Sequence, residues 1–200
     1  AEFAVIHRFL DEGRIEIIGA EHLRAVAGKR PLIGMCLHTG NWEVFAPAFQ
    51  KLGIKLNSII QFPASPAEAS LVDRARRVFG VNPILPDLAG TRQAIRVLRE
   101  NGVVSMFPDE AREGRIMAPL FGRPPHLEGN LAIAARMGRM TGAIFGLGHC
   151  RRVAPCRFEL HVGEMFDLPE RPHPDILADV AYLNERIEPI IRRELPRWYF

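Results

Sequence analysis

The sequence lacks any long hydrophobic run, although 48% of its residues are hydrophobic. No stretch approaches the roughly 18 apolar residues that a membrane-spanning helix requires, and no signal peptide is visible. Internal repeats, linkers and low-complexity segments are also missing. A chain of 200 residues with this composition can bury one full core. Because it begins with Ala1 rather than Met, we expect a single domain over residues 1–200 that lacks an N-terminal membrane anchor.

Cysteine and lysine are both scarce. The three cysteines, Cys36, Cys150 and Cys156, are an odd number without a Cys-x-x-Cys spacing, which argues against a disulfide framework and favours a reducing compartment. Lysine occurs only at positions 29, 51 and 55, so the basic residues are almost all arginine. Guanidinium groups suit phosphates and carboxylates, but genomic base composition explains the same bias equally well.

Along the chain, segments with the hydrophobic pattern of a strand alternate with segments that have the pattern of a helix. This alternation predicts an α/β fold, with a mixed, mostly parallel sheet and helices on both faces. Strands are expected over 14–18, 32–38, 55–61, 82–85, 103–107, 143–149 and 157–162. Helices are expected over 1–12, 21–27, 42–52, 65–80, 91–101, 128–137 and from about residue 174, where Pro189 should cause a kink.

Three segments allow further expectations. Ser65 to Glu68 has the form of a capping box, and residues 111–115 read as a polar loop. The apolar side of the segment 1–12 is rich in aromatic residues, so it fits either a helix that faces the core or one that lies on a membrane surface.

The most informative stretch runs from Leu32 to Glu43. An apolar strand stops at His38, a Thr-Gly-Asn turn follows, and a helix opens at Trp42 and Glu43. Glu43 would then lie within reach of the imidazole, where a carboxylate fixes the tautomer and lets the histidine take a proton from a hydroxyl. The bare His-x4-Glu pair is a weak pattern, because two residues at a fixed spacing often occur by chance and a lone histidine is more often structural.

The full string His-Thr-Gly-Asn-Trp-Glu at residues 38–43 says more, because it resembles the first motif of glycerolipid-type acyltransferases. Its ending is most similar to that of the bacterial lipid A biosynthesis (lauroyl/myristoyl) acyltransferases. Residues 102–125 resemble the second region of that family, and residues 128–138 resemble its glycine-containing helix. The closing pattern of the family resembles Asn184, Glu188, Ile191, Pro196 and Trp198.

The resemblance implies roles for several residues. His38 matches the general base, Glu43 the acid that works with it, Asp109 the acid after the later strand, and Arg77 the substrate-binding arginine. Glu110 is an additional acid that could replace Glu43 as the partner of His38. We expect the substrate-binding residues to be Asn41, Arg76, Arg77, Glu110, Arg112 and Arg123.

The implied activity is direct transfer of a fatty acyl chain from an acyl carrier protein or coenzyme A thioester to a hydroxyl of a membrane lipid, such as a lipid A-type precursor. No Gly-x-Ser-x-Gly motif is present, which agrees with transfer without an acyl-enzyme. Backbone N–H groups of residues 39–42 could stabilise the oxyanion. No cofactor is expected besides the thioester co-substrate. The expected location is the cytoplasmic face of the bacterial inner membrane, as a peripheral protein or one anchored by a segment outside this chain.

Two other classes of function remain open. A metal hydrolase would use ligands among Cys36, His38, His149, Cys150, Cys156 and His161, although no spacing matches a known zinc site. A non-enzymatic module that binds polyanions or membrane surfaces would use Arg74, Arg76, Arg77, Arg151 and Arg152. Scattered arginines without interleaved aromatics are poor evidence for nucleic-acid binding, so no nucleic-acid partner is expected.

Overall fold

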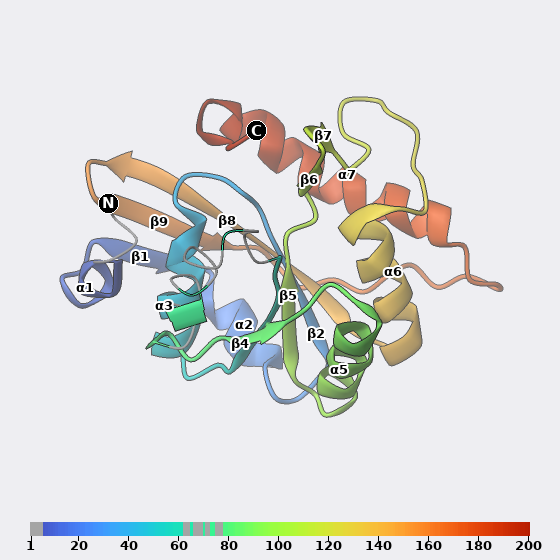
Figure 1. Ribbon diagram of the computed structural model, residues 1–200, viewed down its shortest axis with the longest axis horizontal. Coiled ribbons are helices and arrows are strands. Elements are labelled where there is room, and N and C mark those ends of the chain that lie inside the picture. The colour runs from blue at the N-terminus through green and yellow to red at the C-terminus, as the bar shows by residue number, and fades with distance from the viewer. Residues whose placement is uncertain (1–5, 62–64, 66–69, 71–72, 75–77) are drawn as a thin grey trace.

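A mixed sheet forms the centre of the protein, seen here in a computed structural model that describes residues 6–61, 65, 70, 73–74 and 78–200. Within these residues the sheet has seven strands in the order β1-β9-β8-β2-β5-β3-β4 (Figure 1). All neighbouring pairs are parallel except β8 and β9, which are antiparallel. The strands are β1 (Ile15–Ile18), β2 (Leu32–Cys36), β3 (Leu56–Ile59), β4 (Asn82–Ile84), β5 (Val103–Met106), β8 (Ile144–Ala154) and β9 (Arg157–Val162). The predicted α/β fold is therefore confirmed.

Helices cover both faces of this sheet (Figure 1). One face packs against α5 (Leu88–Arg99), α6 (Gly129–Thr141) and α7 (Ile176–Glu194). The other packs against α1 (Ile6–Asp11), α2 (Ala20–Val26) and α3 (Phe45–Lys51). Each face has its own cluster of buried apolar side chains, as expected when strands alternate their side chains between two covered faces.

The central strand β2 illustrates this alternation. All of its residues are buried. Ile33 and Met35 belong to the cluster under α5–α7, while Leu32 and Cys36 belong to the cluster under α1–α3. Burial of this kind explains why residues 32–36 read as a continuous apolar run rather than an alternating one.

The helix α1 faces the core. Ile6 is fully buried, and Phe9 and Leu10 are 6% exposed within the cluster under α1–α3. For this described part of the segment 1–12, the alternative of a membrane-surface helix is therefore wrong. Within the described residues, none of the helices is both long and apolar enough to span a membrane.

Two local expectations differ from the structure. Residues 111–115 do not form an irregular loop, because β6 (Ala111–Arg112) and β7 (Arg115–Ile116) pair as an antiparallel hairpin. Its two turn residues, Glu113 and Gly114, have φ angles of 50° and 75°, as a type I′ turn requires. Helix α5 begins at Leu88, before the predicted Thr91, because the Asp87 side chain accepts a hydrogen bond from the Gly90 N–H.

The predicted capping box at residues 65–68 lies mostly outside the described residues, and so does most of the helix that it was expected to begin.

The carboxyl ends of β2 and β5 meet at one edge of the sheet, because the two strands are parallel neighbours. His38 follows β2 and Asp109 follows β5, so the sheet brings residues far apart in sequence to the same place. The segment 195–200, which includes the short helix η3 (Leu195–Arg197), lies against the turn after His38. Gly40 N–H donates to the Arg197 carbonyl and Tyr199 N–H donates to the His38 carbonyl, both at 2.9 Å.

Candidate active site

His38 and Asp109 form the central polar contact at this edge. The imidazole Nδ1 lies 3.0 Å from one carboxylate oxygen of Asp109, and the backbone N–H of His38 donates to the other oxygen at 2.9 Å. Asp109 is fully buried, whereas the side chain of His38 is 17% exposed. Because a carboxylate accepts the Nδ1 proton, the tautomer in which Nε2 carries a lone pair is favoured.

The sequence predicts that Glu43 meets the imidazole of His38, but in the structure Nδ1 lies against Asp109 instead, and the role of Glu43 in catalysis stays a prediction. The position expected for Glu43 is occupied by Asp109, because the parallel pairing of β2 with β5 places the residue after β5 directly beside the residue after β2. Glu110 does not replace Glu43 as the partner either, since its carboxylate binds the start of α6.

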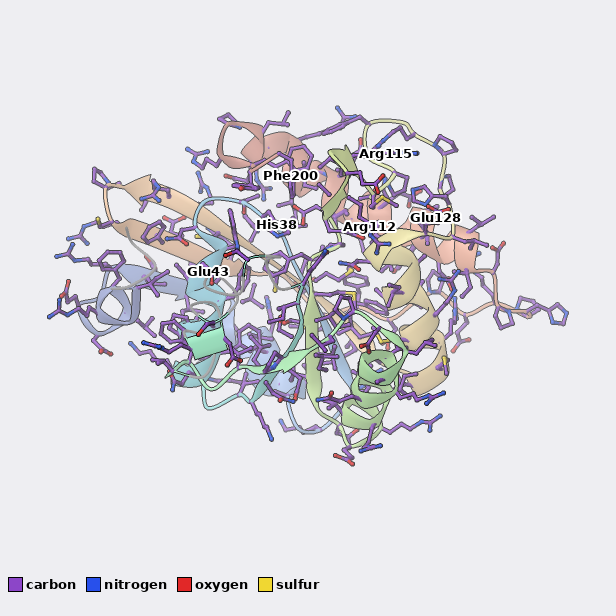
Figure 2. The ribbon with its side chains drawn as sticks, viewed as in Figure 1. His38, Glu43, Arg112, Arg115, Glu128 and Phe200 are labelled. Carbon is purple, nitrogen blue, oxygen red and sulfur yellow. The ribbon has the colours of Figure 1, made fainter. Side chains whose placement is uncertain are left out.

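Aromatic rings hold the imidazole in place. The Phe107 ring stacks on it with a centroid distance of 4.2 Å and an angle of 28°. Trp42 and Phe200 each meet it edge-on at 5.2 Å. Figure 2 shows His38 near the centre of the view, with Phe200 above it and Arg112 beside it. These contacts restrict the ring to the orientation in which Nδ1 faces Asp109.

The turn after His38 passes close to β8. Gly40 has a φ angle of 58°, and a Cβ at this position would lie 2.6 Å from the carbonyl oxygen of Cys150. Only glycine fits both the backbone conformation and the space, which explains the Gly in the His-Thr-Gly-Asn string. The side chain of Thr39 is buried, and its hydroxyl accepts a hydrogen bond from the Cys150 N–H at 3.0 Å.

A cleft of about 710 Å³ opens beside His38. Its walls combine apolar side chains with a few polar ones. The lining residues are His38, Trp42, Ile59, Ile60, Gln61, Pro86, Phe107, Glu110, Ala111, Arg112, Glu113 and Asn130. The cleft therefore offers the imidazole to a bound molecule, together with apolar surface and both signs of charge.

Glu110 forms part of the polar wall. One oxygen, Oε1, accepts the backbone N–H of Asn130 at the start of α6 at 2.8 Å, and Arg112 approaches the same oxygen at 3.4 Å. The other oxygen, Oε2, is buried and has no hydrogen-bond partner among the residues that the structure describes. Burial, and to a lesser extent the charge of Asp109, raises the pKa of Glu110 from the usual 4.5 to about 7, against the opposing effects of Asn130 and Arg112.

The other residues predicted to bind substrate lie in different places. Arg112 lines the cleft with a half-exposed side chain. Arg123 does not, because its guanidinium donates to the carbonyls of Leu120, Ile116 and Ala118 and so holds its own segment together. Asn41 caps η2 (Trp42–Val44) by accepting the Glu43 N–H, and it is not part of the cleft lining. Arg76 and Arg77 lie outside the described residues.

Two of the backbone N–H groups predicted to stabilise an oxyanion are already paired within the protein. Of the backbone N–H groups at residues 39–42, Thr39 N–H donates to the Leu37 carbonyl at 2.8 Å and Gly40 N–H to the Arg197 carbonyl at 2.9 Å. Both are occupied within the protein, so neither can serve as a donor to a bound oxyanion without breaking these contacts.

Comparison with known proteins identifies the family of the chain. A family model described as bacterial lipid A biosynthesis acyltransferase matches residues 7–200, which is nearly the whole chain. The chain belongs to this family. It is an acyltransferase that transfers an acyl group to a lipid. Among proteins with curated function, none matches the sequence.

The acyltransferase is also similar to a solved structure. This is the crystal structure of the 1-acyl-sn-glycerophosphate (LPA) acyltransferase PlsC from Thermotoga maritima, with a TM-score of 0.50 and 16% sequence identity. The match covers 99% of the present chain and 81% of that chain. At this level of identity the likeness concerns the fold, and it agrees with the mixed sheet described above.

Sequence reasoning missed three contacts that shape the site of the acyltransferase. Trp198 donates its indole N–H to Asp109 at 2.9 Å, and the Asn130 side chain donates to the Phe107 carbonyl at 2.8 Å. Glu188 accepts the backbone N–H of Phe121 at 3.0 Å. Trp198 and Glu188 both belong to the closing pattern of the family resemblance. That pattern was the available signal for these contacts, although it assigned no role to either residue.

The structure also locates the residues that a metal hydrolase or a polyanion-binding module would use. Within the described part of the chain, no group of three His, Cys, Asp or Glu side chains is arranged to hold a metal. His149 and His161 stack at 4.8 Å, and burial lowers the pKa of His149 to about 3. Arg151 is paired with Glu159 and Glu194. Burial raises the pKa of the Cys36 thiol, which suits its place in the core.

The raised pKa of Glu110 predicts a pH-dependent stability. Below pH 4.5 the carboxyl is protonated in both folded and unfolded protein, whereas above pH 7 it must ionise inside the cleft wall, which costs about 3 kcal/mol. Glu110→Gln mimics the protonated form and keeps an oxygen for the Asn130 N–H. We therefore expect its unfolding free energy, relative to wild type, to rise by about 2 kcal/mol between pH 5 and pH 8 in urea titrations.

The matched control is Glu113→Gln, which changes an exposed carboxylate in the adjacent hairpin turn. Its difference from wild type should stay nearly constant over the same range. Parallel pH curves for wild type and Glu110→Gln would contradict the assignment of this titration to Glu110.

Proposed function

We propose that the acyltransferase moves a fatty acyl chain from an acyl carrier protein or coenzyme A thioester to a hydroxyl of a membrane glycolipid, a lipid A-type precursor or a similar molecule. The observation that carries this proposal is the His38–Asp109 pair at the carboxyl ends of β2 and β5, whose imidazole lines a partly apolar cleft. A hydroxyl is a poor nucleophile at neutral pH, and a positioned imidazole is the usual group that activates it.

In the proposed reaction, Nε2 of His38 accepts the proton of the acceptor hydroxyl while the hydroxyl oxygen attacks the thioester carbonyl. Asp109 stabilises the imidazolium that forms and keeps Nδ1 turned toward itself. When the tetrahedral intermediate collapses, the carbon–sulfur bond breaks and the thiolate takes the proton back from Nε2. The products are an ester of the lipid and a free thiol, and no covalent enzyme intermediate is formed.

The cleft supports binding of both substrates. Arg112 is placed to pair with a phosphate of the acceptor or of the pantetheine arm, and Arg77 remains a candidate for the same task on the basis of the resemblance. Ile59, Ile60 and Phe107 offer apolar surface for the acyl chain near the thioester. The proposed acceptor is a membrane lipid and the proposed donor is a cytoplasmic thioester. We therefore also propose that the enzyme acts at the cytoplasmic face of the inner membrane.

The test measures both products at once. Purified protein is incubated with acyl carrier protein or coenzyme A thioesters of several chain lengths, with and without a lipid A-type acceptor, and free thiol and acylated lipid are quantified. We expect thiol release that depends on the acceptor and equals the lipid acylated. Release without acylation would indicate a thioesterase, and acylation from neither donor would refute the proposal.

A further inference from the structure

The carboxylate of Asp109 accepts three hydrogen bonds among the described residues. Two come from His38, through its backbone N–H and Nδ1. The third comes from the indole Nε1–H of Trp198, which reaches Oδ2 at 2.9 Å. Trp198 is therefore the donor that orients the carboxylate independently of the histidine. Asp109 is fully buried, so these donors take the place of water around its charge.

The position of Trp198 is fixed by the segment 195–200. Backbone hydrogen bonds tie this segment to the turn after His38, and Thr39 and Trp198 form an isolated antiparallel bridge between them. The indole packs against the core cluster under α5–α7 and meets Phe121 and Phe200 at 6.1 and 5.9 Å. Its N–H is thus directed at Asp109 by contacts on several sides.

The start of the segment is anchored as well. Glu194, the last residue of α7, is 1% exposed and is paired with Arg197 at 3.3 Å and with Arg151 at 3.3 Å. Arg151 comes from β8, which is the neighbour of β2 in the sheet. The segment is therefore connected, through Glu194 and β8, to the same sheet that positions His38.

We infer that Trp198 is a positioning residue of the acyltransferase: by holding Oδ2 of Asp109, its indole N–H keeps Oδ1 directed at Nδ1 of His38. Without this bond, among the described residues only the backbone N–H of His38 still holds Oδ2, so rotation of the carboxylate about its Cβ–Cγ bond is less restrained and the imidazole is oriented less firmly. The inference rests on the proposed role of His38 and Asp109 and adds a third, distant residue to it.

The test compares Trp198→Phe with Tyr182→Phe. The first keeps an aromatic ring and removes the N–H that binds Asp109. The second also removes a single aromatic donor, the hydroxyl that binds the Asp167 carbonyl at 3.2 Å, but away from the cleft. We expect Trp198→Phe to lower kcat about 10- to 100-fold, the range for losing a hydrogen bond to a charged group, with an unchanged KM for the thioester. Tyr182→Phe should leave kcat unchanged.

A purely structural role gives a different result. It would lower the folded fraction while leaving kcat per folded molecule unchanged, and this outcome, or a rise in KM alone, overturns the inference. If Trp198→Phe fails to fold, the inference is tested on the wild-type protein instead, by measuring the NMR resonances of the indole N–H protons of its two tryptophans. We expect slow hydrogen exchange for Trp198 and a shift of its resonance in Asp109→Asn, whereas rapid exchange would overturn the inference.

The proposed function and the role of Trp198 can be refuted separately. Loss of activity in His38→Ala together with full activity in Trp198→Phe refutes only the role of Trp198. Full activity in His38→Ala refutes the proposed function itself.

Discussion

Replacing His38 with alanine should lower kcat for acyl transfer by about 10²- to 10⁴-fold, the usual contribution of a general base. The substitution removes the imidazole that lines the cleft, whereas the backbone N–H of residue 38 still donates to Asp109. We expect the fold to persist, with an unfolding free energy lower by about 1–3 kcal/mol because a buried carboxylate loses one hydrogen bond. Thiol release and lipid acylation measure the first effect, and urea titration measures the second.

His22→Ala is the matched control. His22 is also a partly buried histidine, with Nδ1 3.2 Å from the Val162 carbonyl and Nε2 3.9 Å from the Glu21 carboxylate, but it does not line the cleft. This variant should keep the wild-type kcat. Retention of full activity in His38→Ala, once the protein is shown to be folded, would remove His38 from the mechanism.

Asp109→Asn is expected to have an effect of similar size, about 10³- to 10⁴-fold on kcat. An amide that directs its NH2 group at Nδ1 favours the tautomer with a proton on Nε2, and that tautomer cannot accept the proton of the acceptor hydroxyl. The double variant with His38→Ala should be no slower than the slower single variant, because the two residues act as a unit. Steady-state kinetics on the three variants measure this coupling.

Glu43→Gln separates the two acids that the sequence offered. Because Asp109 and not Glu43 contacts Nδ1, the loss of kcat in Asp109→Asn should exceed the loss in Glu43→Gln. The opposite order would show that the contact between His38 and Asp109 is not the one that matters for catalysis.

Much of the framework of the site could be predicted from the sequence. The apolar runs that end at His38 and just before Asp109 identify two buried strands, and the general behaviour of parallel sheets places their carboxyl ends together. Prediction succeeded here because each strand is a continuous local pattern. It also anticipated the α/β fold class.

The partners of these residues could not be derived in the same way. Which acid meets His38 depends on the order of strands in the sheet, a non-local property that periodicity does not contain. The contact of Trp198 with Asp109 joins segments from opposite ends of the chain. The contacts of Arg123 with carbonyls of its own segment could not be predicted, because such an arginine looks, in sequence, like one that binds phosphate. The hairpin at residues 111–116 was missed because its strands are only two residues long.

The central place of β2 has a consequence for how the enzyme is made. This strand is synthesised before its neighbours β5 and β8, which begin only at Val103 and Ile144. Until both have left the ribosome, a fully apolar strand has two open edges, which is a hazard for aggregation. Pairings of such long range also slow folding. The strand that precedes His38 is therefore a part of the nascent chain that we expect to need protection from aggregation until both neighbours are made.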